Sequence, residues 1–220
     1  MTATLATLRD RVELALMDSG NTIWSTSDID EGLRQALEDY SRVLPDEAQG
    51  TVTLAADGRE VSLSTLTGLL QVLDVYWPYD STQEVWPPNR VTGWRVYYLA
   101  GVPTLYFLSY TGSQPQSGEK VRVWYTKLQT LEDLDSAAAT TFRADHESLI
   151  AYGAAGKAAM ARALNLIETA SIDLYEVGLL AQWGKLKLKE FNYGLDQLRS
   201  YSVRRGRPWM EGWKLDKWDA

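Results

Sequence analysis

One histidine and two acidic clusters are the side chains of this sequence whose types could support catalysis. His146 is the only histidine and cysteine is absent, so a metal site built on several imidazoles or thiolates is excluded. A lone histidine in the first turn of a helix is typical of a capping or surface residue. No glycine-rich loop has the spacing of a phosphate-binding motif. We therefore expect neither a catalytic role for His146 nor a cofactor.

The two acidic clusters are Asp28-Ile29-Asp30-Glu31 and Glu132-Asp133-Leu134-Asp135. Paired carboxylates can hydrolyse glycosides or bind calcium. Neither segment has the spacing of a calcium-binding loop. A helix start accounts for the first cluster and a polar loop for the second. We therefore predict that the protein is not an enzyme and that it holds no metal ion.

Aromatic side chains are unusually frequent, with nine tryptophans and twelve tyrosines in 220 residues. Rings on a β-rich region can stack on sugars, so a carbohydrate-binding or host-recognition module is one interpretation. The alternative is that they fill a core or a subunit interface, where such rings are enriched. The residues that we assign to a subunit interface are Tyr76, Trp77, Trp86 and Trp94.

The C-terminal tail combines basic and aromatic side chains without a regular apolar pattern. It could be an arm that docks tryptophans into a partner protein, a contact with nucleic acid, or a tail folded over its own domain. The net charge of −7 argues against nucleic-acid binding over the whole surface. We favour the partner-binding arm, with contacts from Arg204, Arg205, Arg207, Trp209, Trp213, Lys214 and Trp218.

Apolar spacing predicts the elements that position these residues. Helical spacing predicts helices over about 4–17, 28–44, 145–167 and 171–201. In the last helix one apolar set comprises Leu179, Trp183, Leu186, Leu188, Phe191, Leu195 and Leu198. Strands are predicted over 51–54, 60–63, 69–77, 94–99, 104–108 and 119–128. Asp57-Gly58 and Ala100-Gly101 are both typical of hairpin turns.

These elements predict an α+β fold, in which a bundle of about four helices carries a β-rich insertion between helices 2 and 3. We expect an N-terminal helical hairpin over 1–50, the insertion over 51–141, the C-terminal helices over 142–202 and an extended arm over 203–220. We expect no signal peptide, and no stretch approaches the roughly 20 apolar residues of a membrane span.

The succession of motifs resembles the adaptor proteins that join the portal to the tail in long-tailed and some short-tailed phages. The resemblance covers roughly residues 5–165, and it lies in the order of the motifs more than in any single one. The motifs are Leu8-Arg9-Asp10-Arg11-Val12, Ile23-Trp24-Ser25, Asp28-Ile29, Ala36-Leu37, Leu44-Pro45, Leu69-Leu70-Gln71-Val72-Leu73, Tyr106-Phe107-Leu108, Val121-Arg122-Val123-Trp124-Tyr125, Glu147-Ser148-Leu149-Ile150 and Ala154-Ala155.

This resemblance implies a virion protein of the head–tail junction that assembles in the host cytoplasm. Such proteins form a ring, usually a dodecamer, beneath the portal protein. The ring extends the DNA channel without reading the sequence of the passing DNA, and it offers a platform to tail-completion or tail proteins. In this family the C-terminal arm often reaches into the portal. A different neck subunit, such as a tail-completion protein, is the alternative within the same class.

Overall fold

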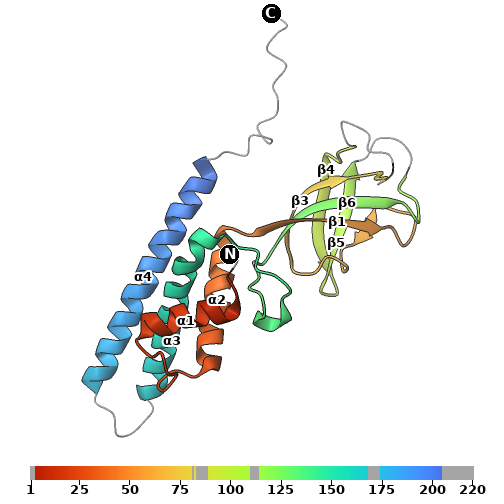
Figure 1. Ribbon diagram of the computed structural model, residues 1–220. Coiled ribbons are helices and arrows are strands. Elements are labelled where there is room, and N and C mark those ends of the chain that lie inside the picture. The colour runs from red at the N-terminus through yellow and green to blue at the C-terminus, as the bar shows by residue number, and fades with distance from the viewer. Residues whose placement is uncertain (1–2, 81, 83–88, 110–113, 168–173, 205–220) are drawn as a thin grey trace, which may run out of the picture. The chain divides into compact units, whose positions relative to one another are not determined.

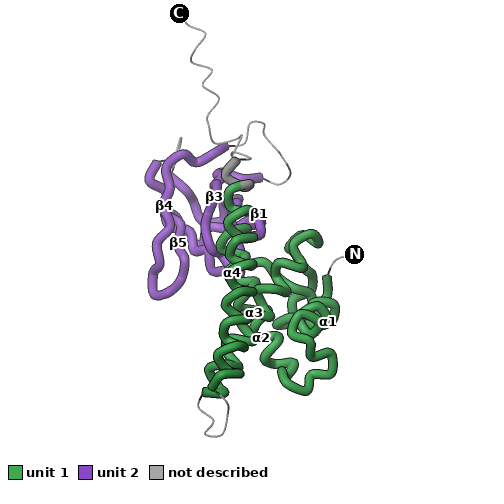
Figure 2. Tube along the Cα trace, turned by 90° about the vertical axis from the view of Figure 1, so that its left-hand side faces the viewer, with its two compact units in different colours: residues 1–44, 129–220 green, residues 45–128 purple. Residues whose placement is uncertain are grey.

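The computed structural model describes residues 3–80, 82, 89–109, 114–167 and 174–204, and for 201–204 only the helical backbone. The chain divides into two compact units. Unit 1 comprises residues 1–44 and 129–220, and unit 2 comprises residues 45–128 (Figures 1 and 2). Unit 1 is helical and unit 2 consists of strands, so the predicted α+β class is confirmed.

Unit 1 is built around α3, which contacts α1, α2 and α4. Two short 3-10 turns, η1 and η2, precede α3 in the chain. The bounds are α1 (Leu5–Leu16), α2 (Thr26–Val43), η1 (Leu134–Ser136), η2 (Ala144–His146), α3 (Glu147–Ile167) and α4 (Leu174–Arg204).

The first two helices begin at capping boxes, which satisfy the free backbone amides of a helix start. The Thr4 hydroxyl accepts a hydrogen bond from the Thr7 amide, and the Thr7 hydroxyl accepts one from the Thr4 amide. At α2 the Ser25 hydroxyl accepts from the Asp28 amide, and the Asp28 carboxylate accepts from the Ser25 amide at 3.0 Å. These polar residues fix where each helix begins.

Small residues on α3 allow α4 to approach closely. A Cβ atom placed on Gly156 would lie 3.1 Å from the carbonyl oxygen of Gly184, and one on Gly184 would lie 3.2 Å from that of Gly156. Gly153 lies against the ring of Phe191, which is fully buried. The two backbones can pack this closely because glycine has no side chain at the crossing.

Unit 2 consists of two three-stranded antiparallel sheets with the strand orders β1-β6-β3 and β2-β5-β4. Both sheets contribute to one core, in which Val121 and Val123 lie with Leu105 and Phe107. The bounds are β1 (Asp46–Thr53), β2 (Glu60–Ser62), β3 (Leu69–Tyr76), β4 (Gly93–Leu99), β5 (Val102–Ser109) and β6 (Lys120–Lys127).

One of the two predicted hairpin turns is correct and the other is wrong. Ala100 and Gly101 both have positive φ and join β4 directly to β5, as expected for a two-residue turn. Asp57-Gly58 joins no hairpin, because β1 pairs with β6 while β2 pairs with β5. The Gly58 amide instead donates to the carbonyl of Pro115, and Asp57 accepts from the amide of Ser117. This loop carries the chain from one sheet to the other.

The β unit also ends earlier than the predicted boundary at residue 141. Residues 129–141 belong to unit 1, where the Leu131 and Leu134 side chains lie in the helical core. Gln129 donates to the carbonyl of Leu44 at 2.8 Å, so the chain leaves and re-enters unit 1 at neighbouring points. Residues 45–50, which we had placed with the first helices, belong to unit 2, where β1 begins at Asp46.

Candidate functional site

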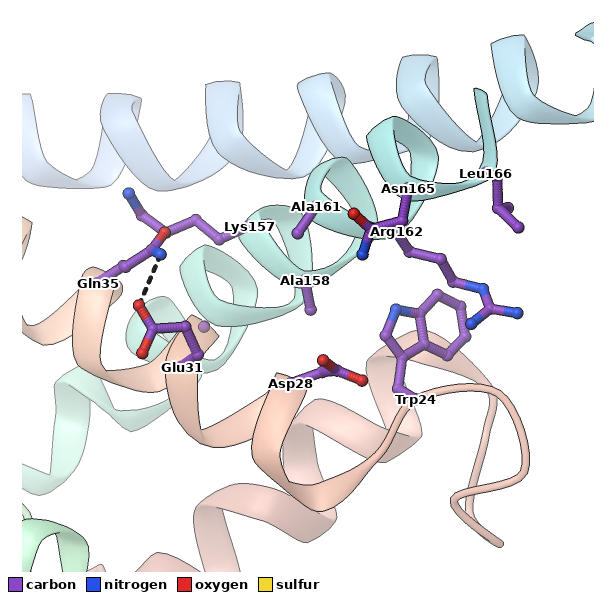
Figure 3. A pocket seen from close by; sticks show the side chains of 11 residues that line it. Trp24, Asp28, Glu31, Gln35, Lys157, Ala158, Ala161, Arg162, Asn165 and Leu166 are labelled. Carbon is purple, nitrogen blue, oxygen red and sulfur yellow. Dashed lines mark hydrogen bonds between the residues drawn. The ribbon is translucent and has the colours of Figure 1, made fainter. Parts of the chain in front are cut away.

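A pocket of about 200 Å³ lies between α2 and α3 (Figure 3). The indole of Trp24 forms one wall, and Glu31 and Gln35 on α2 are joined by a hydrogen bond of 2.9 Å. Arg162 on α3 donates to the carbonyl of Ile23 at 2.6 Å and lies over the Trp24 ring at 5.5 Å. The Trp24 Nε1 is buried, and no hydrogen-bond acceptor for it is found among the described residues.

Asp18 holds the loop that places Trp24 against this pocket. Its buried carboxylate accepts from the hydroxyl and amide of Thr22 at 2.7 and 3.0 Å. It also accepts from the amides of Trp24 and Ile23 at 2.9 and 2.8 Å. These four contacts, that of the Thr22 hydroxyl foremost, hold the pKa of the Asp18 carboxyl well below its usual value. Asp18 is thus a structural residue that the sequence analysis did not single out.

In the two acidic clusters, the carboxylates of Asp28, Asp30, Glu31 and Asp135 are held by neighbouring side chains or backbone. Asp28 caps α2. Asp30 forms a bidentate ion pair with Arg9, in which both hydrogen bonds from the guanidinium to the carboxylate are 2.7 Å long. Arg34 contacts Asp135 at 2.7–2.9 Å and thereby joins α2 to the second cluster. The hydrogen bond from Arg34 lowers the pKa of Asp135. The first cluster therefore serves a helix start and an ion pair between α1 and α2, and Asp135 of the second cluster pairs with α2.

His146 lies in η2 and forms a hydrogen bond through its Nδ1 with the hydroxyl of Tyr40 at 2.6 Å. The two rings meet edge to face with their centroids 5.6 Å apart. Burial lowers the pKa of His146, with Asp145 opposing this shift and Arg143 adding to it. Burial also raises the pKa of Tyr40 to about 12. At neutral pH the pair is therefore uncharged and joins α2 to the start of α3.

This contact predicts that the helical unit loses stability as the pH falls below about 6.5. Because the pKa of His146 is lower when folded than when unfolded, the unfolded chain binds the proton more readily in this window. Stability is therefore full above the unfolded pKa and decreases as the pH falls towards the folded one. Urea unfolding between pH 7.5 and 5 should show this loss, and His146→Gln should reduce it. An equal slope for both proteins would show that another group is responsible.

The aromatic residues assigned to a subunit interface lie in different environments. Trp77 is buried in the core of unit 2, where its ring contacts Phe107 and its Nε1 donates to Glu119 at 3.0 Å. Trp94 is partly buried against the same core. The Tyr76 hydroxyl, also partly buried, donates to Asp74 at 3.0 Å. Trp77 therefore serves the core, and an interface role stays a prediction for Tyr76 and Trp94.

Two further predictions fall outside the described residues. Trp86 lies there, and so does the proposed arm beyond the end of α4 at Arg204. The backbone of Arg204 continues α4, which extends the helix three residues past the predicted end. The arm residues Arg205, Arg207, Trp209, Trp213, Lys214 and Trp218 keep their assignment as a prediction.

A stripe of exposed apolar side chains on α4 is a surface that the sequence analysis missed. The α4 stripe consists of Tyr175, Leu179, Leu186 and Tyr193, whose exposed fractions are 72%, 49%, 55% and 67%. We had placed Leu179 and Leu186 in the same apolar set as Phe191, which is fully buried. The stripe's spacing of four, seven and seven residues was visible in the sequence. It puts all four residues on one side of a helix.

Comparisons with known proteins add two distant structural likenesses. No protein family matches the sequence, and no curated protein matches it either. A chain in the virion of a native gene transfer agent particle is 15% identical, with a TM-score of 0.32, over 82% of this chain and 88% of that one. A chain in the neck of an empty gene transfer agent particle is 14% identical, with a TM-score of 0.30, over 83% and 89%. At these TM-scores the likeness does not establish a shared fold.

Proposed function

We propose that the protein is a structural subunit of the neck of a tailed phage, an adaptor that forms a ring between the portal and the tail. The observation that carries this proposal is apolar surface left outside both cores. On unit 1 it comprises the α4 stripe, and on unit 2 it comprises Tyr98, Leu99 and Leu108 in the β4–β5 hairpin. Exposed apolar side chains that share one side of an element can mark a site of protein–protein contact. A ring subunit needs several such sites, for its two neighbours and for the components above and below.

The roles of the ionisable groups also support a binding protein without enzymatic activity. Asp28 is a helix cap, Asp30 and Asp135 are paired with arginines, and His146 is joined to Tyr40. No group of three or more acidic or histidine side chains suited to a metal ion occurs in the described ranges. Similarly, none of the helices in those ranges is both long and apolar enough to cross a bilayer. The residues proposed to carry the function are those of the exposed apolar surfaces.

The C-terminal arm is proposed as the contact with the portal. Its three tryptophans supply large apolar anchors, and its arginines and lysines supply charged hydrogen-bond donors. Twelve such arms in a dodecamer would turn a modest contact into a strong joint by multivalency. The ring would be the conduit for passing DNA, which an acidic body of net charge −7 leaves free to move.

Deleting residues 205–220 should leave a folded protein that no longer binds the portal. The deletion begins after the last residue of α4, so both cores keep every described side chain. Binding to purified portal rings of the same phage can be measured by cosedimentation, and circular dichroism with thermal unfolding reports the fold. Replacing Trp209, Trp213 and Trp218 with alanine is the matched variant that keeps the length and the charge.

If the truncated protein bound portal rings as strongly as the full chain, the arm would not be the contact with the portal. The carbohydrate-binding alternative makes a different prediction, since a lectin should retain glycans on an array and need form no ring. An adaptor should bind no glycan and should appear on portal rings at a fixed stoichiometry. A tail-completion protein should bind the assembled adaptor ring and not the portal itself.

A further inference from the structure

We propose that the pocket between α2 and α3 binds a carboxamide, the uncharged group of asparagine and glutamine side chains and of the peptide backbone. The carbonyl oxygen of the ligand would accept a hydrogen bond from Trp24 Nε1, and its N–H would donate to the Asp28 carboxylate. The pocket lies wholly within unit 1, and neither the C-terminal arm nor the α4 stripe contributes to its lining. The site and its test therefore do not depend on the proposed function in the neck.

The first observation is a buried hydrogen-bond donor that lacks an acceptor. Trp24 is 6% exposed, and its Nε1 has no partner in the part of the chain that the structure describes. The indole nitrogen lies on the edge of the ring that faces Ala158 and the inside of the pocket (Figure 3). Because buried N–H groups in proteins are almost always paired, the missing acceptor is expected to belong to whatever fills the pocket.

The second observation is that the charges around the pocket are balanced and already have partners. Two acidic and two basic side chains line it. Lys157 pairs with Asp39 at 2.7 Å, and Arg162 donates to a backbone carbonyl. Glu31 accepts a hydrogen bond at each of its carboxylate oxygens. A charged ligand would therefore meet a like charge for each opposite one, so this lining favours an uncharged ligand.

The third observation is a carboxylate oxygen of Asp28 that has spare capacity to accept. Asp28 Oδ2 accepts from the amide and the hydroxyl of Ser25 at 3.0 and 2.7 Å, whereas no hydrogen bond to Oδ1 occurs within the described ranges. This carboxylate points from α2 toward the Trp24 ring (Figure 3). The pocket thus offers one N–H donor and one spare acceptor. A carboxamide carries the matching acceptor and donor in a single uncharged group.

The size and walls of the pocket suit a group as large as a side chain. Its volume is about 200 Å³, whereas a single water needs roughly 10–15 Å³ of cavity. Gly32, Ala158 and Ala161 contribute small side chains to the lining, and the Trp24 indole adds a flat apolar wall. The pocket therefore has room for the carbon atoms that carry a carboxamide as well as for the carboxamide itself.

Nuclear magnetic resonance of the full chain, labelled with ¹⁵N-tryptophan, tests this site through the indole N–H groups. The nine tryptophans give nine indole cross-peaks, and Trp24→Phe identifies the Trp24 peak by its loss. Should Trp24→Phe not fold, Arg162→Lys identifies the same peak by its shift, because it changes the cation over the ring. Propionamide should move the Trp24 peak saturably and leave the other peaks in place. Half-saturation is expected at roughly 1–10 mM for a ligand with so few non-hydrogen atoms.

Related small molecules test each feature of the ligand separately. Butanone keeps the carbonyl oxygen and lacks the N–H, so it should bind about tenfold more weakly than propionamide. Propionate has nearly the same shape but a negative charge beside Asp28, and it should bind at least about tenfold more weakly. N-methylacetamide represents the peptide backbone as propionamide represents asparagine and glutamine side chains. The tighter binder of these two amides identifies the source of the carboxamide.

A variant that fills the pocket and a matched control locate the binding. Ala161 lines the pocket and is exposed, so Ala161→Leu should keep the fold and abolish the propionamide shift. Ala6→Leu makes the same change at an exposed alanine of α1 outside the pocket, and it should leave the shift unchanged. A shift that never saturates, or that persists in Ala161→Leu, would mean that solvent alone satisfies Nε1 and would overturn the proposal. Tighter binding of propionate than of propionamide would overturn it as well.

Discussion

Replacing Gly32 with alanine should lower the free energy of unfolding by about 1–3 kcal/mol, although alanine favours helix over glycine. Gly32 lies on α2 and is buried against α3. A Cβ atom added there would lie 2.7 Å from the carbonyl oxygen of Ala154, closer than real Cβ contacts allow. Because that oxygen belongs to a helix backbone, the two helices would have to separate along their whole contact.

Gly178→Ala is the matched control for this prediction, since it makes the same chemical change in another helix. Gly178 is exposed on α4, and a Cβ atom there meets nothing within 4 Å. Its replacement should therefore raise the free energy of unfolding by up to about 1 kcal/mol. Urea denaturation of both variants gives the two changes, which should differ in sign. A stabilising Gly32→Ala would mean that α2 and α3 do not approach as closely as described.

The parts of the fold that sequence predicted well are those whose pattern is local. The strand predicted over 119–128 is confirmed as β6, the centre of its sheet, and its alternating residues Val121, Val123 and Tyr125 are buried. The helix start predicted at the first acidic cluster is confirmed, and the mutual hydrogen bonds of Ser25 and Asp28 cap α2 there. Ala100-Gly101 correctly indicated a hairpin, because the two strands that it joins, β4 and β5, pair with each other.

The parts that sequence did not predict depend on pairings distant in the chain. Asp57-Gly58 has the same local signal as Ala100-Gly101, yet its flanking strands pair with β6 and β5 more than 40 residues away. Asp18 resembles an ordinary helix end in the sequence, and only the folded loop brings four donors to its carboxylate. Local composition does not distinguish these cases, since the partner strand or loop decides them.

The candidate site was predicted least well because apolar character alone does not say what covers a residue. Trp77 was assigned to an interface and lies in a core, whereas Leu179 and Leu186 were assigned to a helix face with Phe191 and are exposed. Angular position separates them, because Leu186 and Phe191 are five residues apart and so point about 140° from each other on a helix. A helix with two apolar faces was therefore described as one with a single wide face.

Phe191 and Tyr193 should respond to substitution in opposite ways although they are two residues apart on α4. Phe191 is fully buried on Gly153, so Phe191→Ala should lower the free energy of unfolding by about 3–5 kcal/mol, from lost burial and from the cavity it leaves. Tyr193 is 67% exposed, so Tyr193→Ala should change that free energy by about 0.5 kcal/mol or less. Urea unfolding of the isolated copies measures both values.

For self-association we expect the reverse order, with the larger effect from substitution of Tyr193 and the smaller from substitution of Phe191. Tyr193 belongs to the α4 stripe, one of the apolar surfaces proposed for contacts in the ring, so its truncation should weaken association between copies while the monomer stays as stable as wild type. Phe191→Leu keeps most of the buried volume and should leave association between folded copies unchanged, because the side chain points into unit 1. Separate effects on folding and assembly would establish that α4 serves a core on one side and a neighbour on the other. If Tyr193→Ala instead destabilised the monomer as much as Phe191→Ala, the stripe would be covered within its own chain.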